Sequence, residues 1–501
     1  MAEKNQDDIH KVLQSLSSEI GESDKPVAII LAAGHGKRIK SERSKMLHEI
    51  WGVPTVVRVA EAAAKGLNSN NQIIVVGIKA KQVAESAAQS PNRVFVFQKE
   101  QLGTGDATQV GLSILNNREN VGNIYIFPGD MGLLNADVVR QFMTEFEDSD
   151  SDMMVLTGTY KGDPEENVYG RIIRVPECDI DGNSSPDHNK VIEIKEHKDI
   201  LAIPEKSGYN LKHNGREYHF SRQELLDIDE YNAGVYAVKY EPLRSFISQI
   251  SPDNVQSEFY LTDIVSLFIK NNLRVGATRA QDNTSVIGFN VKSVLHEMEC
   301  IAREKVWKKI RDIVFIEDEN EFFIADEVVE QILEFDEKYP SVDIFIGRGV
   351  QLHRGVQINR GVTIKAYSIL SGNVIMGENS IIEENVWLST YPHQKIEIGN
   401  NCVIMRGDIV KGSIIIGENS RVESGVIITG SDEFSSIIGK NVIIKGTTYI
   451  FGSIVEDDLF IEHSVLKCKR VHRIKKPDGS IKAVRWVLPQ PQGLDVVEGL
   501  D

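Results

Sequence analysis

The sequence predicts a three-layer, Rossmann-like α/β domain followed by a parallel β-helix built from hexapeptide repeats. Short apolar runs alternate with amphipathic helical patterns early in the chain, and this alternation is typical of β–α–β crossover units. After Ser341, aliphatic residues recur every six positions, a period that gives one short strand and one turn per repeat. The chain of 501 residues is also longer than one hydrophobic core usually organises.

We therefore expect five segments. They are an N-terminal extension (1–24), the α/β domain (25–300), a helical linker (301–340), the β-helix (341–466) and a basic C-terminal tail (467–501). Apolar residues at three- and four-residue spacing predict a short helix in the extension, which we interpret as loosely docked. The tail contains a hairpin signal at Pro477–Ser480, and we interpret this tail as solvated or packed on itself rather than as a site for an acidic partner.

Apolar periodicity places the elements of the α/β domain. We expect strands and helices to alternate, with a polar, irregular stretch over 179–228 that forms surface excursions. The segment 291–335 has a helical pattern. The expected strands are Val27–Ala32, Gln72–Gly77, Arg93–Phe97, Asn123–Phe127, Val191–Lys195, Tyr231–Tyr240 and Ser285–Asn290, and the expected helices include Val56–Lys65 and Ala80–Ala88.

The repeats after Ser341 begin with Ile346, Leu352, Ile358 and Ile364, and after a slip in phase they resume at Ile398. Each aliphatic side chain is expected to point inward, and glycines that follow several of them relax the corners. This pattern predicts a fold. It favours a structural or trimerising role over a catalytic one.

Composition excludes several functional classes. The net charge of −17 argues against general nucleic-acid binding, which needs a basic surface. The four cysteines are far apart and form no CxxC pair, so neither a disulfide framework nor a zinc site is expected. We find no secretory signal and no apolar run of membrane-spanning length. We expect a cytoplasmic protein without nucleic-acid or membrane partners.

A glycine-rich turn, Leu31–Arg38, follows the first strand. Glycines let consecutive backbone N–H groups approach a phosphate, and Arg38 and Lys45 add positive charge where triphosphate charge develops. The turn matches neither the Rossmann nor the Walker A pattern. Taken alone, it is explained equally well as a structural turn.

Three further elements favour a nucleotide site. Gln101–Ala107 is a second glycine-rich loop that can enclose a base or ribose. Asp130 follows an apolar strand, and Asn290 follows another predicted strand. Carboxylate and amide oxygens suit Mg²⁺, which leaves coordination positions for phosphate and water. Capping of a helix is the alternative role for Asp130.

This combination resembles the sugar nucleotidyltransferases, and most closely the pyrophosphorylase half of the bacterial bifunctional enzymes that make UDP-N-acetylglucosamine. The resemblance covers roughly 26–300, with a β-helix following in the same order. It rests on motifs in a shared order: Leu31–Ile39, Ser44–His48, Gln98 with Gln101–Ala107, Tyr169–Ile172, Glu196–Asp199, Asn232–Gly234 and Glu258–Ile264.

The resemblance implies residue roles. Arg38 and Lys45 would be catalytic, and Asp130 and Asn290 would bind Mg²⁺. Contacts to the substrates would come from Leu31, Ala32, Ala33, Gly34, Gln98, Gly103, Thr104, Gly170, Glu196 and Asn232.

The implied reaction joins UTP and N-acetylglucosamine-1-phosphate to give UDP-N-acetylglucosamine and pyrophosphate, a step in cell-envelope sugar biosynthesis. The resemblance also implies that the β-helix is left-handed and holds a homotrimer together.

Several positions depart from the family pattern. Asp106 replaces a histidine, Pro128 a tyrosine and Gly132 a proline, and the segment 199–230 is longer. We expect Pro128, Gly132 and the longer segment to lie near the sugar pocket. N-acetylglucosamine-1-phosphate is therefore the first choice, with glucose-1-phosphate or another sugar-1-phosphate open.

The acetyltransferase marks of the bifunctional enzymes are absent after Ser341. The candidate bases His353, His393 and His463 are better interpreted as surface or corner residues. Three hypotheses remain: a uridylyltransferase with a non-catalytic β-helix, a bifunctional enzyme with a different acyl site, and a catalytically silent regulatory subunit that binds nucleotide sugars.

Overall fold

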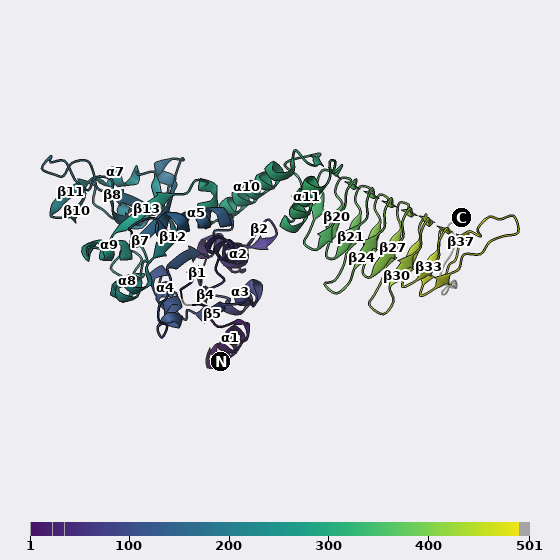
Figure 1. Ribbon diagram of the computed structural model, residues 1–501, viewed down its shortest axis with the longest axis horizontal. Coiled ribbons are helices and arrows are strands. Elements are labelled where there is room, and N and C mark those ends of the chain that lie inside the picture. The colour runs from purple at the N-terminus through teal and green to yellow at the C-terminus, as the bar shows by residue number, and fades with distance from the viewer. Residues whose placement is uncertain (1, 23, 35, 490–501) are drawn as a thin grey trace, which may run out of the picture. The chain divides into compact units, whose positions relative to one another are not determined.

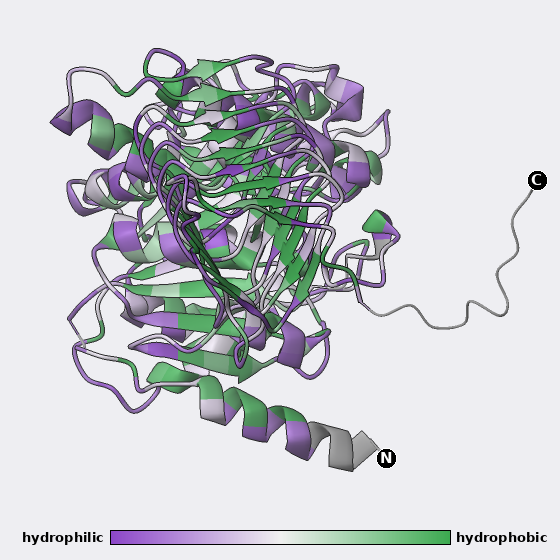
Figure 2. Ribbon diagram, turned by 90° about the vertical axis from the view of Figure 1, so that its right-hand side faces the viewer, coloured by the Kyte–Doolittle hydropathy of each residue, from purple (hydrophilic) through white to green (hydrophobic). Residues whose placement is uncertain are grey.

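The computed structural model describes residues 2–22, 24–34 and 36–489 and divides into two compact units, Met1–Glu299 and Cys300–Asp501. Figure 1 shows an α/β unit followed in the chain by a stack of β-helical coils. The strands of both units are mostly hydrophobic, whereas turns and outer helix faces carry the hydrophilic residues (Figure 2). Among the described residues, no helix is long and apolar enough to cross a bilayer.

The first unit is built on one mixed sheet with the strand order β13-β7-β12-β6-β1-β4-β5. Strands β1, β4, β5 and β6 run parallel, and β12 runs antiparallel to β6 and β7. Its strands are β1 (Val27–Ala32), β4 (Gln72–Val76), β5 (Arg93–Phe97), β6 (Ile124–Pro128), β7 (Met153–Thr159), β8 (Arg171–Arg174), β9 (Val191–Lys195), β12 (Glu230–Val238) and β13 (Val275–Arg279). Two small hairpins are formed by β2 (Glu49–Ile50) with β3 (Val53–Pro54), and by β10 (Tyr209–His213) with β11 (Arg216–Phe220).

Helices cover both faces of this sheet. Alternate residues of β1 enter different cores: Ala28 and Ile30 pack under α2, α3 and α5, and Val27 and Ile29 pack under α4, α8 and α9. The predicted three-layer arrangement is therefore confirmed. The helices are α1 (Ala2–Leu16), α2 (Thr55–Leu67), α3 (Ala80–Ala87), α4 (Thr104–Leu112), α5 (Ala136–Glu147), α6 (His197–Leu201), α7 (Arg222–Leu226), α8 (Tyr240–Phe246), α9 (Asp263–Lys270) and α10 (Lys292–Ile310).

Short 3-10 turns join these elements. They are η1 (Lys37–Ile39), η2 (Lys45–Leu47), η3 (Ser113–Leu115), η4 (Pro164–Glu166), η5 (Ile247–Gln249) and η6 (Asn283–Val286). The strand expected at Ser285–Asn290 is wrong, because η6 occupies its first two residues and no strand forms over the other four. The Asp282 carboxylate accepts the Thr284 N–H at 3.0 Å and caps this turn, which favours helical over extended backbone.

The N-terminal helix packs on the first unit more closely than we expected from the sequence, which we had interpreted as a loosely docked extension. Leu13 is buried in the same core as α2 and α3. Behind the helix, Ser17 Oγ accepts the Phe95 N–H at 2.9 Å, and the Ser18 N–H donates to the Arg93 carbonyl at 2.7 Å. Helix α1 thus covers the edge strand β5, as strands at sheet edges generally require.

The second unit is a parallel β-helix with three sheets, as predicted. On its first sheet, residues in register stack inward and are fully buried, including Ile346, Ile364, Ile382 and Ile404. That sheet contains β14 (Phe315–Ile316), β16 (Phe345–Ile346), β19 (Thr363–Ile364), β22 (Ile381–Ile382), β25 (Val403–Ile404), β28 (Arg421–Val422), β31 (Ile443–Lys445), β34 (Phe460–Glu462) and β37 (Val484–Arg485).

The other two sheets complete each coil. One contains β15 (Phe323–Ile324), β17 (Gln351–Leu352), β20 (Ile369–Ser371), β23 (Trp387–Ser389), β26 (Ile409–Lys411), β29 (Ile427–Thr429), β32 (Tyr449–Phe451) and β35 (Val465–Lys467). The third contains β18 (Val356–Gln357), β21 (Val374–Met376), β24 (Ile396–Ile398), β27 (Ile414–Ile416), β30 (Ser436–Ile438), β33 (Ile454–Val455) and β36 (Arg470–Val471).

The β-helix extends beyond the expected segment at both ends. Its first coil begins at β14 and β15, inside the expected helical linker, and α11 (Asp326–Lys338) follows β15. Gln331 of α11 bonds the Val356 carbonyl at 3.1 Å and the Ile358 N–H at 3.2 Å, so the helix satisfies backbone groups at the open end of the third sheet. At the other end, β36 and β37 lie within the expected tail.

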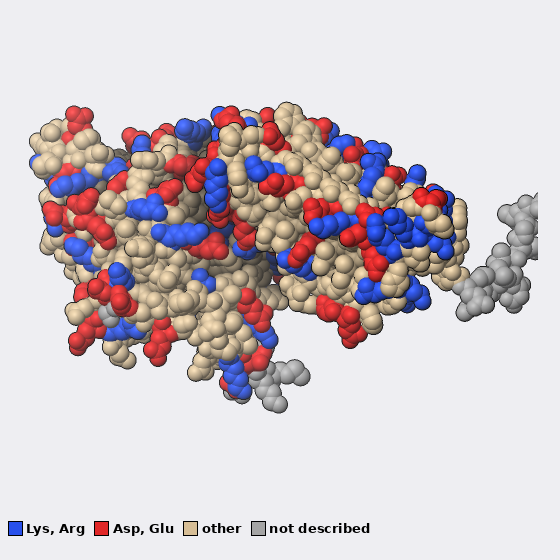
Figure 3. Space-filling view, turned by 45° about the vertical axis from the view of Figure 1, so that its right-hand side comes forward, with Lys and Arg blue, Asp and Glu red and all other residues tan. Residues whose placement is uncertain are grey.

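The predicted hairpin near Pro477 is present, with an antiparallel bridge between Lys475 and Ile481. The tail after 489 lies outside the described residues. Charged side chains on the coils pair with the next coil, as in Arg360–Glu378 and Lys365–Glu383, at 2.9 and 2.8 Å. On the face drawn in Figure 3, basic side chains accordingly lie beside acidic ones.

Candidate nucleotide and sugar site

A cavity of about 770 Å³ opens at the carboxyl ends of β1 and β6. The strand order reverses here, because β4 lies on one side of β1 and β6 on the other. Ligands of open α/β sheets generally bind at such a switch point. Of the predicted site residues, those that line the cavity are Leu31, Ala33, Gly34, Arg38, Lys45, Gln98, Gly103, Thr104, Asp130, Glu196, Asn232 and Asn290.

Ala32 and Gly170 are not among the lining residues. Ala32 is buried in the core beneath α2. Gly170 lies behind Glu196: a Cβ at this glycine would stand 3.0 Å from Glu196 Oε1. Its carbonyl accepts the Asn232 N–H at 2.9 Å. Both residues therefore shape the site through their neighbours.

The glycine turn after β1 brings Lys45 over the strand ends. Gly36 has φ +59°, and a Cβ there would stand 2.9 Å from Lys45 Cβ, so the turn needs a glycine for conformation and for space. Arg38 lies on η1 and is exposed. Lys45 lies on η2, and its side chain is 10% exposed. His35, within the same motif, falls outside the described residues.

Two segments converge on the Lys45 ammonium. Lys45 Nζ forms an ion pair with Asp130, donates to Asn290 Oδ1 at 2.8 Å and lies 5.4 Å from the centre of the Phe289 ring. Gly288 leaves room for the carboxylate, since a Cβ there would stand 3.3 Å from Asp130 Oδ2. Two oxygens, from the turn after β6 and from the loop after η6, thus face the single ammonium group of Lys45.

This donor pair fits a hard divalent cation, because such ions take carboxylate and amide oxygens and keep positions for phosphate and water. Among the described residues, no group of three or more His, Cys, Asp or Glu side chains is arranged to hold a metal. A cation at Asp130 and Asn290 would complete its coordination with phosphate oxygens and water.

A second loop closes the opposite side of the cavity. Gln98 follows β5, is 3% exposed and lines the cavity together with Gly103 and Thr104. Gly103 has φ +123°, and a Cβ there would stand 2.5 Å from the Phe259 carbonyl oxygen. The Leu261 N–H donates to Thr104 Oγ1 at 3.0 Å. The loop is thus held against the segment that precedes α9.

Asn232 is aimed into the cavity by a bulge in β12. The pairing register shifts between Asn232 and Val235, where Gly234 has φ +79°. Asn232 Oδ1 accepts the Gly234 N–H at 2.9 Å, and Asn232 Nδ2 donates to the Tyr236 hydroxyl at 2.7 Å. Bulges commonly re-aim a side chain in this way. The sequence pattern located the strand but gave no signal for the bulge or for Tyr236 as a lining residue.

Glu196 stands between two cavities. Burial, followed by the charges of Asp199 and Asp263, raises its pKa to about 7. Burial likewise raises the pKa of Asp263 to about 6. A carboxyl with a pKa near neutrality changes its charge readily when a ligand arrives.

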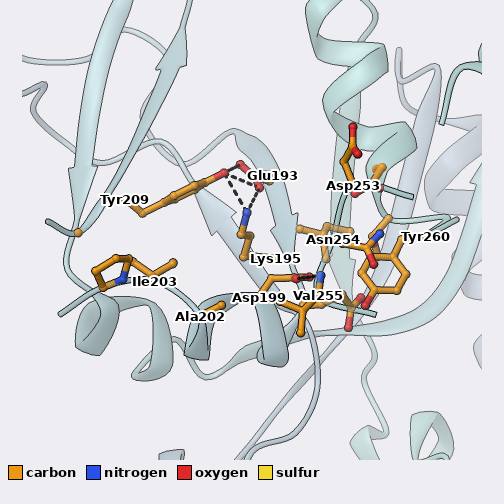
Figure 4. A pocket seen from close by; sticks show the side chains of 16 residues that line it. Glu193, Lys195, Asp199, Ala202, Ile203, Tyr209, Asp253, Asn254, Val255 and Tyr260 are labelled. Atoms are coloured by element: carbon orange, nitrogen blue, oxygen red, sulfur yellow. Dashed lines mark hydrogen bonds and ion pairs between the residues drawn. The ribbon is translucent and has the colours of Figure 1, made fainter. Parts of the chain in front are cut away.

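The adjoining cavity, of about 380 Å³, shares Glu196 and Thr262 with the larger one. Figure 4 shows Tyr209 and Lys195 directed toward Glu193. The Tyr209 hydroxyl donates to Glu193 at 2.8 Å, and Lys195 Nζ lies 3.4 Å from the same carboxylate. Tyr209 belongs to the hairpin β10–β11, so the longer segment after Asp199 supplies a wall of the smaller cavity.

One expected position is wrong. Gly132 does not line either cavity; a Cβ there would stand 2.7 Å from Ile50 Cγ1 and 2.8 Å from Thr55 Cγ2, so this glycine accommodates β2 and α2. Pro128, by contrast, lines the larger cavity.

Residues 28–177 match the family model described as the MobA-like NTP transferase domain. A bifunctional protein GlmU from Lactobacillus johnsonii is 34% identical over 278 residues, which are 56% of this chain and 52% of the relative. The GlmU of Clostridium tetani is 31% identical over 279 residues, with the same coverage. The chain thus spans about half the length of the curated relatives it matches.

Solved structures show weaker similarity. UDP-glucose pyrophosphorylase in complex with UDP-glucose is 15% identical with a TM-score of 0.38, covering 57% of this chain and 99% of the other. A nucleotidyl transferase from Methanothermobacter thermautotroptrophicus is 12% identical with a TM-score of 0.35, covering 56% and 99%. The family match and the curated relatives together confirm the expected resemblance to the nucleotidyltransferases.

Proposed function

We propose that the first unit transfers a nucleotidyl group from a nucleoside triphosphate to a sugar-1-phosphate and releases pyrophosphate. The observation that carries the proposal is the convergence of Lys45, Asp130 and Asn290 at one end of the cavity. Gln98 and Glu196 line the same cavity. The nucleotide would be UTP and the sugar N-acetylglucosamine-1-phosphate, so the product would be UDP-N-acetylglucosamine.

The chemistry needs position and charge rather than a covalent intermediate. An oxygen of the sugar phosphate attacks the α-phosphorus of UTP in line, the P–O bond to the β-phosphate breaks, and pyrophosphate leaves. Lys45 and Arg38 neutralise the charge that develops on the phosphate oxygens. A Mg²⁺ ion held by Asp130 and Asn290 would supply further charge neutralisation when bound.

Glu196 and Asn232 would bind the sugar. The Glu196 carboxylate accepts hydrogen bonds from hydroxyl groups, and the Asn232 amide both donates and accepts. Gly170 sets the position of both, through the Asn232 N–H and through contact with Glu196. Because Pro128 and the 199–230 segment depart from the family pattern near this side, glucose-1-phosphate is the second candidate sugar.

The β-helix would hold a homotrimer together without catalysing a second reaction. Its second sheet carries an outward column of apolar side chains, and Trp387, Ile427 and Tyr449 in that column are 49%, 39% and 36% exposed. The full column is Ile369, Trp387, Ile409, Ile427, Tyr449 and Val465. A continuous exposed apolar stripe is typical of an interaction surface. Sedimentation of the purified protein should give the mass of three chains.

The three candidate histidines lie on the surface of the coils. His353 lies 5.0 Å from the Phe323 ring centre, and His463 stacks on Trp486 at 4.5 Å. His393 bonds Asp432 at 2.7 Å on a side chain that is 64% exposed. Each has a packing or surface role that needs no acyl-transfer chemistry.

The decisive assay follows pyrophosphate release from each nucleoside triphosphate with a panel of sugar-1-phosphates and Mg²⁺. We expect turnover with UTP and N-acetylglucosamine-1-phosphate. Binding of UTP without pyrophosphate release from any pair would instead support a regulatory subunit. Thiol release from acetyl-CoA with glucosamine-1-phosphate would support a second active site in the β-helix. A cytoplasmic location stays a prediction from the sequence.

A further inference from the structure

Asp106 lies behind the candidate base-binding residue Gln98. It is in the first turn of α4 and is not among the residues that line the cavity, whereas Gln98 is. Gln98 Nε2 donates to Asp106 Oδ2 at 2.6 Å and, at 3.4 Å, to the Gly103 carbonyl. The amide nitrogen of Gln98 therefore faces two acceptors, the Asp106 carboxylate and the Gly103 carbonyl.

These contacts determine which atom of Gln98 faces a ligand. An ionised carboxylate only accepts hydrogen bonds, so it fixes the amide with its NH₂ group toward Asp106. No described residue donates to the other terminal atom, the carbonyl oxygen Oε1. Because Gln98 lines the cavity and is otherwise buried, Oε1 is the side-chain atom it offers to a base.

The position of Asp106 is itself well fixed. Gly105 N–H donates to the Phe259 carbonyl at 2.8 Å, and the Ala107 N–H donates to the Gly103 carbonyl at 3.1 Å. Gly111 of α4 packs so closely on the sheet that a Cβ there would stand 3.0 Å from Ile29 Cγ2. An acidic side chain in the first turn is also favoured by the helix dipole.

We propose that Asp106 is a positioning residue that sets nucleobase specificity by holding Gln98 with Oε1 toward the base. The inference rests on the proposed function. A fixed acceptor selects a base that presents a ring N–H. Uracil presents N3–H at the position where cytosine has a lone pair, so the arrangement accepts the first base and repels the second.

The test compares Kd and kcat/KM for UTP, CTP and N3-methyl-UTP in the wild-type protein and in Asp106→Asn. Asparagine is isosteric but can donate as well as accept, so it permits Gln98 to turn its NH₂ toward the base. We expect the wild type to disfavour CTP and N3-methyl-UTP by about 10- to 100-fold. In Asp106→Asn the UTP-to-CTP ratio should fall about tenfold or more, mainly through Kd and KM.

Two further variants separate positioning from helix stabilisation. Asp137→Asn removes the acid from the first turn of α5 and should leave the ratio unchanged. Asp106→Glu keeps an acceptor and should retain most of the selectivity. If Asp106→Asn does not fold, Gln98→Leu serves in its place, because it removes Oε1 and should abolish discrimination.

An unchanged UTP-to-CTP ratio in folded Asp106→Asn, or equal use of N3-methyl-UTP and UTP by the wild type, would overturn the proposal. The Kd values decide this point even if no sugar-1-phosphate supports turnover. Failure of the proposed function therefore appears in the pyrophosphate assay, and failure of the Asp106 inference appears in the binding ratio.

Discussion

Asp408 in the β-helix offers a quantitative test of how the coils are packed. It is fully buried, its Oδ1 accepts the Val426 N–H at 2.8 Å, and its Oδ2 has no hydrogen-bond partner among the described residues. Burial raises the pKa of this carboxyl from 3.8 to about 8. At the equivalent corner two coils earlier, Ser368 accepts the Val386 N–H at 3.1 Å with a hydroxyl group. We predict that Asp408→Ser stabilises the unit near neutral pH.

The magnitude follows from proton linkage. Because the folded pKa lies above the unfolded value, the folded state binds the proton more tightly, and stability falls as pH rises from about 4 to about 8. Between pH 4 and pH 7 the free energy of unfolding falls by about 1.4 kcal/mol per pH unit. Over these roughly three units the wild type loses about 4 kcal/mol of stability. Subtracting about 1 kcal/mol for the smaller buried side chain leaves about 3 kcal/mol.

The assay is calorimetric or denaturant-induced unfolding of wild type and variant at pH 5 and pH 8. For a unit of this size, the predicted gain corresponds to a Tm increase of about 6–12 °C at neutral pH, shrinking toward pH 5. Ser368→Ala is the matched control and should destabilise at both pH values, because it removes the capping acceptor. A difference between Asp408→Ser and wild type that is the same at both pH values would refute the account of a buried carboxyl whose pKa is raised in the folded state.

Three predictions concern the first unit. Asp130→Ala should lower kcat by about 10²–10³-fold with an unchanged far-UV spectrum; retained turnover would exclude it as a metal ligand. The pKa of Glu196, raised to about 7, means that its carboxylate is lost below pH 7, so kcat/KM for the sugar phosphate should fall about tenfold per pH unit there. Glu196→Gln should be slower but lack this slope, and an identical profile would assign the titration to the substrate. Gly103→Ala should raise KM for the nucleotide about tenfold, because its Cβ would meet the Phe259 carbonyl and φ is +123°; an unaltered KM would show that the loop does not contact the nucleotide.

Elements with a clear local period were predictable from the sequence. Arg93–Phe97 and Val191–Lys195 have the bounds that the apolar pattern predicted. A buried strand between turn residues is visible in the local sequence as a short apolar run with polar ends. The antiparallel direction of β12 was not predictable, since a strand buried between two neighbours has a similar apolar sequence pattern whether it runs parallel or antiparallel to them. The two-residue strands β14 and β15 were missed because they are too short to show a period, and their pairing with the next coil decides their conformation.

The site was partly predictable for the same reason. Asn290 was expected at the end of a strand, and although it lies in the loop after the capped turn η6, its side chain still meets Lys45. The motifs identified which residues lie together in the cavity. Long-range contacts of the fold determine how their side chains are oriented. The pair formed by Gln98 and Asp106 illustrates the difference: both residues belonged to one recognised motif, but only the fold shows the 2.6 Å contact that orients the amide.

Under the proposed function, two features of the cavity wall would bear on the choice of sugar. Pro128 packs against the bulge in β12, where a Cβ at Gly234 would stand 3.0 Å from Pro128 Cγ, and this bulge holds the Asn232 amide through the Gly234 N–H. The second feature is the smaller cavity: after burial, which is the main cause, the charges of its Asp199 and Asp263 raise the pKa of Glu196. Whatever neutralises those carboxylates lowers the pKa of Glu196 and changes the hydrogen bonds it offers to a sugar. If Glu196 binds the sugar as proposed, the charges of the smaller cavity would therefore influence sugar binding through the pKa of Glu196, even where no part of the substrate enters that cavity.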